Sequence, residues 1–105
     1  MILRRWTARA TNHGAREYET HFRESVLPAL AAVAGHRGAY LLRRVDGESA
    51  DVELTVMTLW NSMEDVQAFA GDNPQHAVVE PHARQALTAF DELVSHHELI
   101  VNTTG

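Results

Sequence analysis

The order of short apolar patterns along this 105-residue chain constrains its fold more than any other feature of the sequence. Residues 2–9 mix apolar side chains with arginines, which predicts a strand. From about residue 13 to residue 34, apolar side chains recur at steps of three and four, which predicts a helix with one buried stripe. Asn12 is a favourable residue to begin this helix, Gly35 is suited to end it, and Pro28 predicts a kink or break just before it.

Two further strands and a second helix follow. Residues 36–45 and 52–60 are rich in strand-forming side chains, and the polar loop 46–51 between them contains a glycine, so they predict a hairpin. Ser62 followed three residues later by Asp65 is a capping-box pattern, which predicts a short helix that Gly71 closes.

The last third of the chain predicts one more strand. Residues 75–88 are expected to be irregular or partly helical, with a break at Pro81, and the strand is expected from about residue 90 to residue 101. The resulting order, strand–helix–strand–strand–helix–strand, is that of the ferredoxin-like βαββαβ unit. We therefore expect one α+β domain over residues 1–105, with a four-stranded antiparallel sheet and both helices on one face.

The predicted strand 52–60 is apolar on both faces. One face carries Leu54, Val56 and Trp60, and the other carries Met57 and Leu59. Because the helices can cover only one face, the other face is left as an apolar patch, and such patches usually mark an interface. The simplest cover is the same sheet from a second copy, which predicts a homodimer joined through sheet faces. A more twisted monomer covered by its own tail is the alternative.

Composition excludes several classes of function. The net charge of −5 disfavours nucleic acid as a partner, because phosphate binding needs clustered cations. The absence of cysteine excludes disulfides, thiolate nucleophiles and zinc–thiolate sites, and it fits a reducing cytoplasm. Neither a secretion signal nor an apolar stretch long enough to cross a bilayer is present, so no membrane partner is expected.

Three parts of the sequence carry a family resemblance: residues 58–64 with 68–71, residues 35–40, and residues 90–98. On these segments the chain resembles the antibiotic biosynthesis monooxygenase family of dimeric α/β-barrel proteins over nearly its whole length. The resemblance implies a pocket in each subunit between the sheet and its own helices. It also implies oxygenation of an aromatic, polyketide- or quinol-like small molecule without metal, flavin or any other cofactor, since the substrate itself reduces oxygen after losing a proton.

A sister group of this family degrades haem, and its residues match this chain poorly. That group uses an asparagine on the first strand, where this sequence has Trp6 or Thr7, and a tryptophan in the second helix, where it has Phe69. A haem-ligating histidine follows in that group, and His76 or His82 lies near that place without clear register. Three hypotheses remain: a cofactor-independent monooxygenase, a non-catalytic small-molecule-binding dimer, and, least favoured, a haem-binding oxygenase.

Histidines are the candidate catalytic bases. His76 and His82 lie in the irregular segment after the second helix, which can border the pocket mouth in this fold, and His96 lies on the last strand. A neutral imidazole in such a place can take a phenolic proton. The alternative for the two loop histidines is simple exposure to solvent. His96 and His97 are adjacent on a strand and point to opposite faces, so they cannot hold one metal ion together.

The first predicted helix carries a further group of polar side chains. His13, Glu17 and His21 are spaced four residues apart and could meet at one metal ion. The apolar stripe of the helix is centred on the other side, however, so we expect a solvated face and no metal site.

Aromatic side chains and one arginine are expected to bind the substrate. Arg4 shares a strand face with Trp6 by alternation, so it needs either a partner or a cavity, where it could hold an anionic substrate. Neutralisation by Glu53 or Glu98 is the favoured interpretation, and exposure at a sheet edge is a further alternative. The expected pocket-lining aromatic residues, for each of which a place in the core is the favoured interpretation, are Trp6, Tyr18, Phe22, Tyr40, Trp60 and Phe69.

Overall fold

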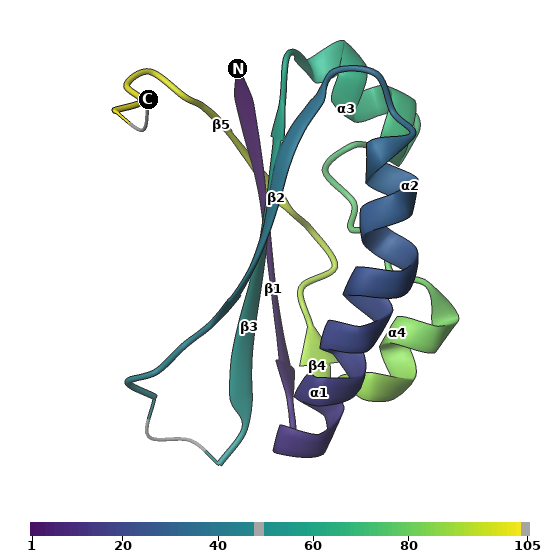
Figure 1. The fold of residues 1–105 in the computed structure, drawn as a ribbon, viewed down its shortest axis with the longest axis vertical. Helices are drawn as coiled ribbons and strands as arrows, with labels where there is room; N and C mark the ends of the chain where they lie inside the picture. Colours follow the sequence, from purple (N-terminus) through teal and green to yellow (C-terminus); the bar gives the residue numbers. More distant parts are fainter. Residues whose placement is uncertain (48–49, 104–105) are drawn as a thin grey trace.

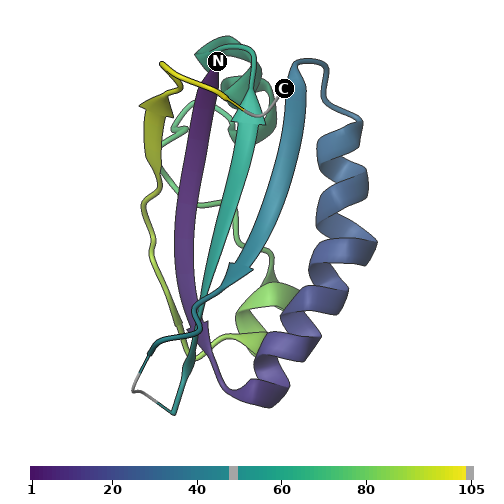
Figure 2. The same ribbon diagram turned by 60° about the vertical axis from the view of Figure 1, so that its left-hand side comes forward.

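A computed structural model describes residues 1–47 and 50–103 of the chain. It has the expected α+β architecture, an antiparallel sheet with its helices packed on one face (Figure 1). The long strands are β1 (Ile2–Ala10), β2 (His36–Arg43) and β3 (Val52–Trp60), and they lie in the order β2-β3-β1. The C-terminal part of the chain pairs with the free edge of β1 and completes the sheet, so the predicted ferredoxin-like order is confirmed (Figure 2).

The sheet edge beside β1 differs from the single strand that the sequence predicts. Two short strands lie there, β4 (Ala89–Phe90) and β5 (Ser95–Glu98), both antiparallel to β1. Between them the chain leaves β1, and the amide of Val94 donates to the carbonyl of Gln75 at 2.8 Å. The prediction of one continuous strand over 90–101 is therefore wrong, because residues 91–94 bond partly to the segment after the second helix.

The long helix begins one residue earlier than predicted and is interrupted as expected. It comprises α1 (Asn12–His21), the π-helical segment η1 (Phe22–Val26) and α2 (Leu27–Ala31). Thr11, rather than Asn12, is the N-cap, and its hydroxyl accepts from the amide of Gly14 at 3.0 Å. The predicted break before Pro28 takes the form of the π turn, which is one of the ways a helix absorbs a local irregularity.

The second half contains two short helices. Helix α3 (Met63–Ala70) begins at the predicted cap, where the amide of Asp65 donates to the Ser62 hydroxyl, and Gly71 ends it with a φ of 85°. Helix α4 (Pro81–Ala86) begins where the sequence predicts a break. Pro81 therefore begins a helix instead of breaking one. A proline at the first helical position loses no hydrogen bond, because the amide at that position has no partner within the helix.

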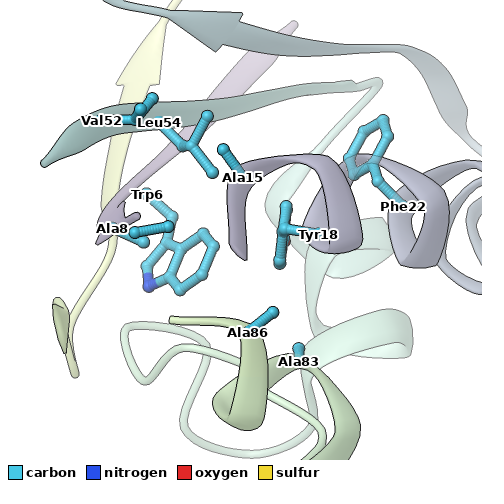
Figure 3. Packing of buried hydrophobic residues seen from close by; sticks show 10 residues of the cluster. Trp6, Ala8, Ala15, Tyr18, Phe22, Val52, Leu54, Ala83 and Ala86 are labelled. Atoms are coloured by element: carbon cyan, nitrogen blue, oxygen red, sulfur yellow. The ribbon is translucent and has the colours of Figure 1, made fainter. Parts of the chain in front are cut away.

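Two clusters of buried side chains join the sheet to the helices. In the larger cluster, Trp6 and Ala8 of β1 pack against Tyr18 of α1 and against Ala83 and Ala86 of α4 (Figure 3). The smaller cluster consists of Leu30, Trp60 and Val66. Among the described residues, no helix combines the length and the apolar content that crossing a bilayer requires.

The other face of the sheet carries no helix (Figure 1). Tyr40 and Leu42 of β2 are 52% and 43% exposed there, and Met57 lies directly opposite Tyr40. Leu59 and Leu3 form the next pair on this face and are half-buried. The apolar open face that the sequence predicts is therefore present. Two residues of the predicted hairpin loop, Glu48 and Ser49, lie outside the described residues.

Candidate functional site

A cavity of about 90 Å³ lies between the covered face of the sheet and the helices. Strands β1 and β3 form its floor, and α1, η1, α2, α3 and the segment 77–80 surround it. Most of the lining is apolar, but four titratable side chains reach it: Arg4, Tyr18, His21 and Glu80. An apolar cavity with a few convergent polar groups is the usual form of a small-molecule site.

Arg4 is the buried cation of this cavity. Alternation along β1 places it on the helix side, and it is only 6% exposed. Its guanidinium donates to the carbonyl of Pro74, to the carbonyl of His76 at 3.1 Å and to Nε2 of His96 at 3.0 Å. All three partners are neutral when His96 is unprotonated.

Neither of the carboxylates that the sequence suggests as partners reaches Arg4. Glu53 instead lies 3.2 Å from Arg44 and 3.9 Å from Arg9. Glu98 is exposed and is paired in the sheet with Ile2. Across residues 1–47 and 50–103, no carboxylate lies within ion-pair distance of Arg4. Arg4 is therefore neither neutralised by Glu53 or Glu98 nor exposed at a sheet edge; its side chain lines the cavity.

The Arg4–His96 contact fixes the tautomer of His96, and burial shifts the pKa of both groups. Because a guanidinium has no acceptor atom, Nε2 of His96 must accept, so the ring proton sits on Nδ1. Burial lowers the pKa of His96, and the nearby charges of Arg4 and His97 lower it further. Burial also lowers the pKa of Arg4 to about 10, which leaves the guanidinium charged at neutral pH.

His21 is a cavity-lining residue that the sequence analysis missed. It was expected on a solvated face, yet its side chain is only 5% exposed and lines the cavity. The signal was present, because His21 lies three residues after Tyr18 and directly before Phe22, both on the buried stripe. His13 and Glu17 behave as expected, with side chains 74% and 52% exposed and paired with each other.

His21 stands between the cavity and the surface. Nε2 of His21 lies 4.0 Å from the Glu80 carboxylate, and the rings of His21 and His82 are 5.5 Å apart. His21 and Glu80 line the inner cavity and also a surface groove that His82 borders. In the part of the chain that the structure describes, no group of three or more histidine, aspartate or glutamate side chains is placed to hold a metal ion.

Aromatic side chains form one wall of the cavity. Trp6 and Tyr18 have ring centroids 5.9 Å apart, and the indole N–H of Trp6 donates to the carbonyl of Asp91 at 2.7 Å. Burial, with a smaller contribution from the charge of Glu80, raises the pKa of Tyr18 to about 12. Tyr18 is therefore a neutral phenol at physiological pH and can donate a hydrogen bond but cannot act as a base.

The remaining predicted site residues divide between the cavity and other places. Phe69 lines the cavity with Arg4, Trp6 and Tyr18. Trp60 is fully buried in the smaller core cluster, and Phe22 faces a groove between α1 and β2. Tyr40 lies on the open face of the sheet. The side chains of His76 and His82 are outside the cavity and exposed, whereas His96 reaches it through Arg4.

Known proteins share this fold but show little similarity in sequence. The sequence matches no protein-family model and no curated protein. Two structures of MhuD, a heme-degrader from Mycobacterium tuberculosis, resemble it with TM-scores of 0.72 and 0.66 at 23% and 24% identity, each covering at least 98% of both chains. SnoaB, a cofactor-independent oxygenase from Streptomyces nogalater, has a TM-score of 0.63 at 12% identity over 99% of this chain and 98% of SnoaB.

A further solved structure bears the family name. A putative antibiotic biosynthesis monooxygenase from Chloroflexus aurantiacus J-10-fl matches with a TM-score of 0.54 at 16% identity, covering 99% of this chain and 96% of the other. The chain has the antibiotic biosynthesis monooxygenase fold. The resemblance that the sequence indicates is thereby confirmed at the level of the fold.

Within this fold, the residues that the sequence analysis compares with those of the haem-degrading group can now be placed. Trp6 faces the cavity, whereas Thr7 lies on the other side of β1 and bonds Asp91. Phe69, which the sequence resemblance sets against the tryptophan of the haem-degrading group, lines the cavity. The rings of His76 and His82 lie outside the cavity, as described above.

Proposed function

We propose that this chain is a cofactor-independent monooxygenase that oxidises an aromatic small molecule of the polyketide or quinol kind. The observation that carries the proposal is a buried guanidinium and a buried imidazole on facing sides of one aromatic-walled cavity: Arg4 on the sheet side and His21 on the helix side. A cation that stabilises an anion and a base that creates it are the two groups this chemistry needs from a protein.

The reaction divides into a proton transfer and an oxidation. His21 takes a proton from the substrate and can pass it outward past Glu80 and His82, whose side chains reach the surface groove. The resulting anion, held against Arg4, reduces dioxygen. For a CH₂ group between aromatic rings, one oxygen atom becomes a carbonyl on that carbon and the other leaves as water with the two hydrogens. The carbon supplies all four electrons, so no further reductant is required.

His76, His82 and His96, the bases suggested by the sequence, take different places in this scheme. His82 is beside His21 and suits a proton relay. His96 accepts from Arg4 and positions the guanidinium, and its depressed pKa keeps it neutral for that role. His76 contributes its backbone carbonyl to Arg4, while its exposed ring suits exchange of protons with solvent.

Substrate entry must enlarge the cavity. A volume of about 90 Å³ holds about three waters at the density of the liquid and is smaller than a cavity known to hold benzene. The segment 71–80 has no helix or strand of its own, and its residues 77–80 form part of the cavity wall. Irregular segments over a rigid scaffold are the parts of a protein that open most readily, so we propose that the substrate enters by displacing this segment.

Support for oxygenase chemistry comes from proteins with the same fold, because SnoaB is a cofactor-independent oxygenase and MhuD degrades heme. The functional form that we propose is a homodimer joined through the open sheet faces, with one cavity per subunit. A non-catalytic binding dimer would use the same cavity, and the experiment separates the two.

Oxygen consumption tests the proposal directly. Purified protein is given anthrones, quinols and phenols in an oxygen electrode, without added metal, flavin or nicotinamide, and the product is analysed after reaction with isotopically labelled dioxygen. We expect one labelled oxygen atom in the product. Ligand binding without oxygen consumption would identify the binding-module function instead. A haemin titration that saturated at one haem per subunit would favour the haem-binding oxygenase.

A further inference from the structure

No acidic side chain among the residues that the structure describes neutralises the charge of Arg4. The side chain is 6% exposed, and its three hydrogen-bond partners are two backbone carbonyls and an imidazole that must be unprotonated at the accepting atom. Transfer of an unpaired charge into an apolar interior is costly, and proteins usually offset it with a counter-charge. Among the described residues no carboxylate takes that place.

Glu80 is the acidic side chain that shares the cavity, and it is committed elsewhere. Its carboxylate faces His21, and its side chain is 58% exposed, so it is largely solvated. The site around Arg4 is therefore positive in an otherwise apolar cavity. A low-dielectric cavity of this kind strengthens any interaction between the guanidinium and an anion that enters it.

The guanidinium also has unused donors. An arginine presents five N–H groups, and the contacts to Pro74, His76 and His96 use three of them. Two N–H groups remain, one on Nε and one on Nη2. Pairs of N–H groups on one guanidinium match the two oxygens of a carboxylate or the adjacent oxygens of an acidic phenol.

We propose that the ligand of this cavity is an anionic aromatic molecule whose carboxylate or acidic phenol binds Arg4, with its flat apolar body against Trp6, Tyr18 and Phe69. The proposal rests on the cavity assigned above and narrows its substrate class from aromatic molecules in general to those carrying an acidic group. The acidic group supplies the counter-charge that the chain lacks, and the aromatic wall accepts the ring.

A pair of ligands that differ in charge tests the proposal without any turnover. Benzoate and benzamide have nearly the same shape, but benzoate is anionic at pH 7, and a single ring demands the least enlargement of the cavity. Their dissociation constants are measured by tryptophan fluorescence, to which Trp6 in the cavity wall contributes, and by the shift in melting temperature. We expect benzoate to bind about ten- to a hundredfold more tightly than benzamide, the range typical of a hydrogen bond to a charged group.

Variants assign the preference to Arg4. Arg4→Gln should abolish it, and Arg4→Lys, which keeps the charge but loses the fork of donors, should reduce it. Arg16→Gln, which removes an exposed arginine on α1, is the matched control and should keep the full preference. If Arg4→Gln does not fold, Arg4→Lys and the wild-type comparison decide the question.

Several outcomes would overturn the proposal. They are equal binding of the two ligands, no binding of benzoate at millimolar concentration, or a preference that survives the loss of Arg4. These results are independent of the oxygen-electrode experiment. A protein that prefers benzoate but consumes no oxygen with any substrate would retain the anion site and lose the oxygenase function.

Discussion

His13 and His21 lie on one helix, two turns apart, in opposite environments. The side chain of His13 is 74% exposed and pairs with Glu17, whereas that of His21 is 5% exposed and lines the cavity. The two residues are eight positions apart, which sets them about 80° from each other on an ideal helix. Helix α4 packs along α1 as far as Gly14, where an added Cβ would lie 2.2 Å from the Ala86 carbonyl oxygen, and Glu80, just before α4, lies beside His21. The burial of His21 thus follows both from its place beside the apolar stripe of the helix and from its contact with the segment that carries Glu80.

This difference gives a paired prediction for activity. If His21 is the base, His21→Gln should lower the rate of oxygen consumption by about 10²–10⁴-fold, the usual contribution of general acid–base catalysis. His13→Gln should leave the rate unchanged, and both are measured with the same substrate in the oxygen electrode. Circular dichroism of both variants checks that the fold is kept. Full activity of His21→Gln would assign the proton to another group, His82 and His96 being the next to test.

His96 gives a prediction for stability. Because folding lowers its pKa, the unfolded chain binds more protons than the folded one between the folded pKa and the ordinary histidine value of about 6.5. The contribution of His96 to stability is therefore fully present above about pH 6.5 and is lost as the pH falls through that window. Urea unfolding at a series of pH values should show a shallower loss for His96→Gln than for the wild type. His13→Gln, which alters an exposed histidine, should follow the wild-type slope more closely.

The site was predictable from sequence only where one element determined the position. Alternation along β1 placed Arg4 and Trp6 on the cavity face, and the helical period placed Tyr18 there. The pairing of Arg4 with His96 and two loop carbonyls was not predictable, because it joins segments about 70 and 92 residues away along the chain. Nothing local in the sequence specifies such contacts.

At the scale of elements, Gly35 joins the long helix to the sheet with a φ of 88°, as Gly71 ends α3 with a φ of 85°. Their surroundings differ. A Cβ on Gly35 would lie 2.2 Å from the carboxyl carbon of Asp65, whereas a Cβ on Gly71 would meet no atom within 4 Å. Asp65 is held in place by the Ser62 hydroxyl at 3.0 Å, so it cannot move away without losing that bond.

The two glycines therefore form a matched pair. Gly71→Ala should destabilise the protein by about 1–3 kcal/mol, because a φ of 85° with a ψ of −163° lies in a region that essentially only glycine adopts. Gly35→Ala should cost about 0.5–1.5 kcal/mol more, because Asp65 must give up its hydrogen bond. Urea unfolding measures both. The excess should vanish when Gly35→Ala is made in an Asp65→Ala background; an unchanged excess there would place the strain elsewhere.

The elements themselves were largely predictable, and the exceptions share a physical cause. Helix α3 and strands β1 and β3 carry caps or alternation within their own residues, and they form as expected. The break between β4 and β5 and the start of α4 at Pro81 depend on how residues 75–94 pair with one another. Such non-local pairing leaves little periodic signal in the sequence.

At the scale of the whole molecule, the open face of the sheet is the feature that the single chain leaves unexplained. It joins Leu3, Tyr40, Leu42, Met57 and Leu59 across three strands. Cover by the chain's own tail, the alternative left open by the sequence, is not seen over the described residues, because Ile100 and Val101 are 82% and 72% exposed. An apolar face of this kind in a soluble assembly is normally covered by another chain.

We therefore predict that the wild-type protein sediments as a dimer at micromolar concentration and that Leu59→Glu dissociates or unfolds it. Residue 59 lies opposite Leu3 and Gly38, so a sheet-to-sheet interface would bury the new carboxylate without a facing cation, at a cost of several kcal/mol. Gln67→Glu, which adds the same charge on an exposed position of α3, should remain dimeric. Sedimentation velocity over a range of concentrations distinguishes the outcomes, with Met57→Glu as a second, milder substitution on the same face, because Arg5 lies opposite residue 57. A wild-type protein that stays monomeric at every accessible concentration would contradict the prediction. Loss of the dimer in both open-face variants, but not in Gln67→Glu, would assign the interface to this side of the sheet.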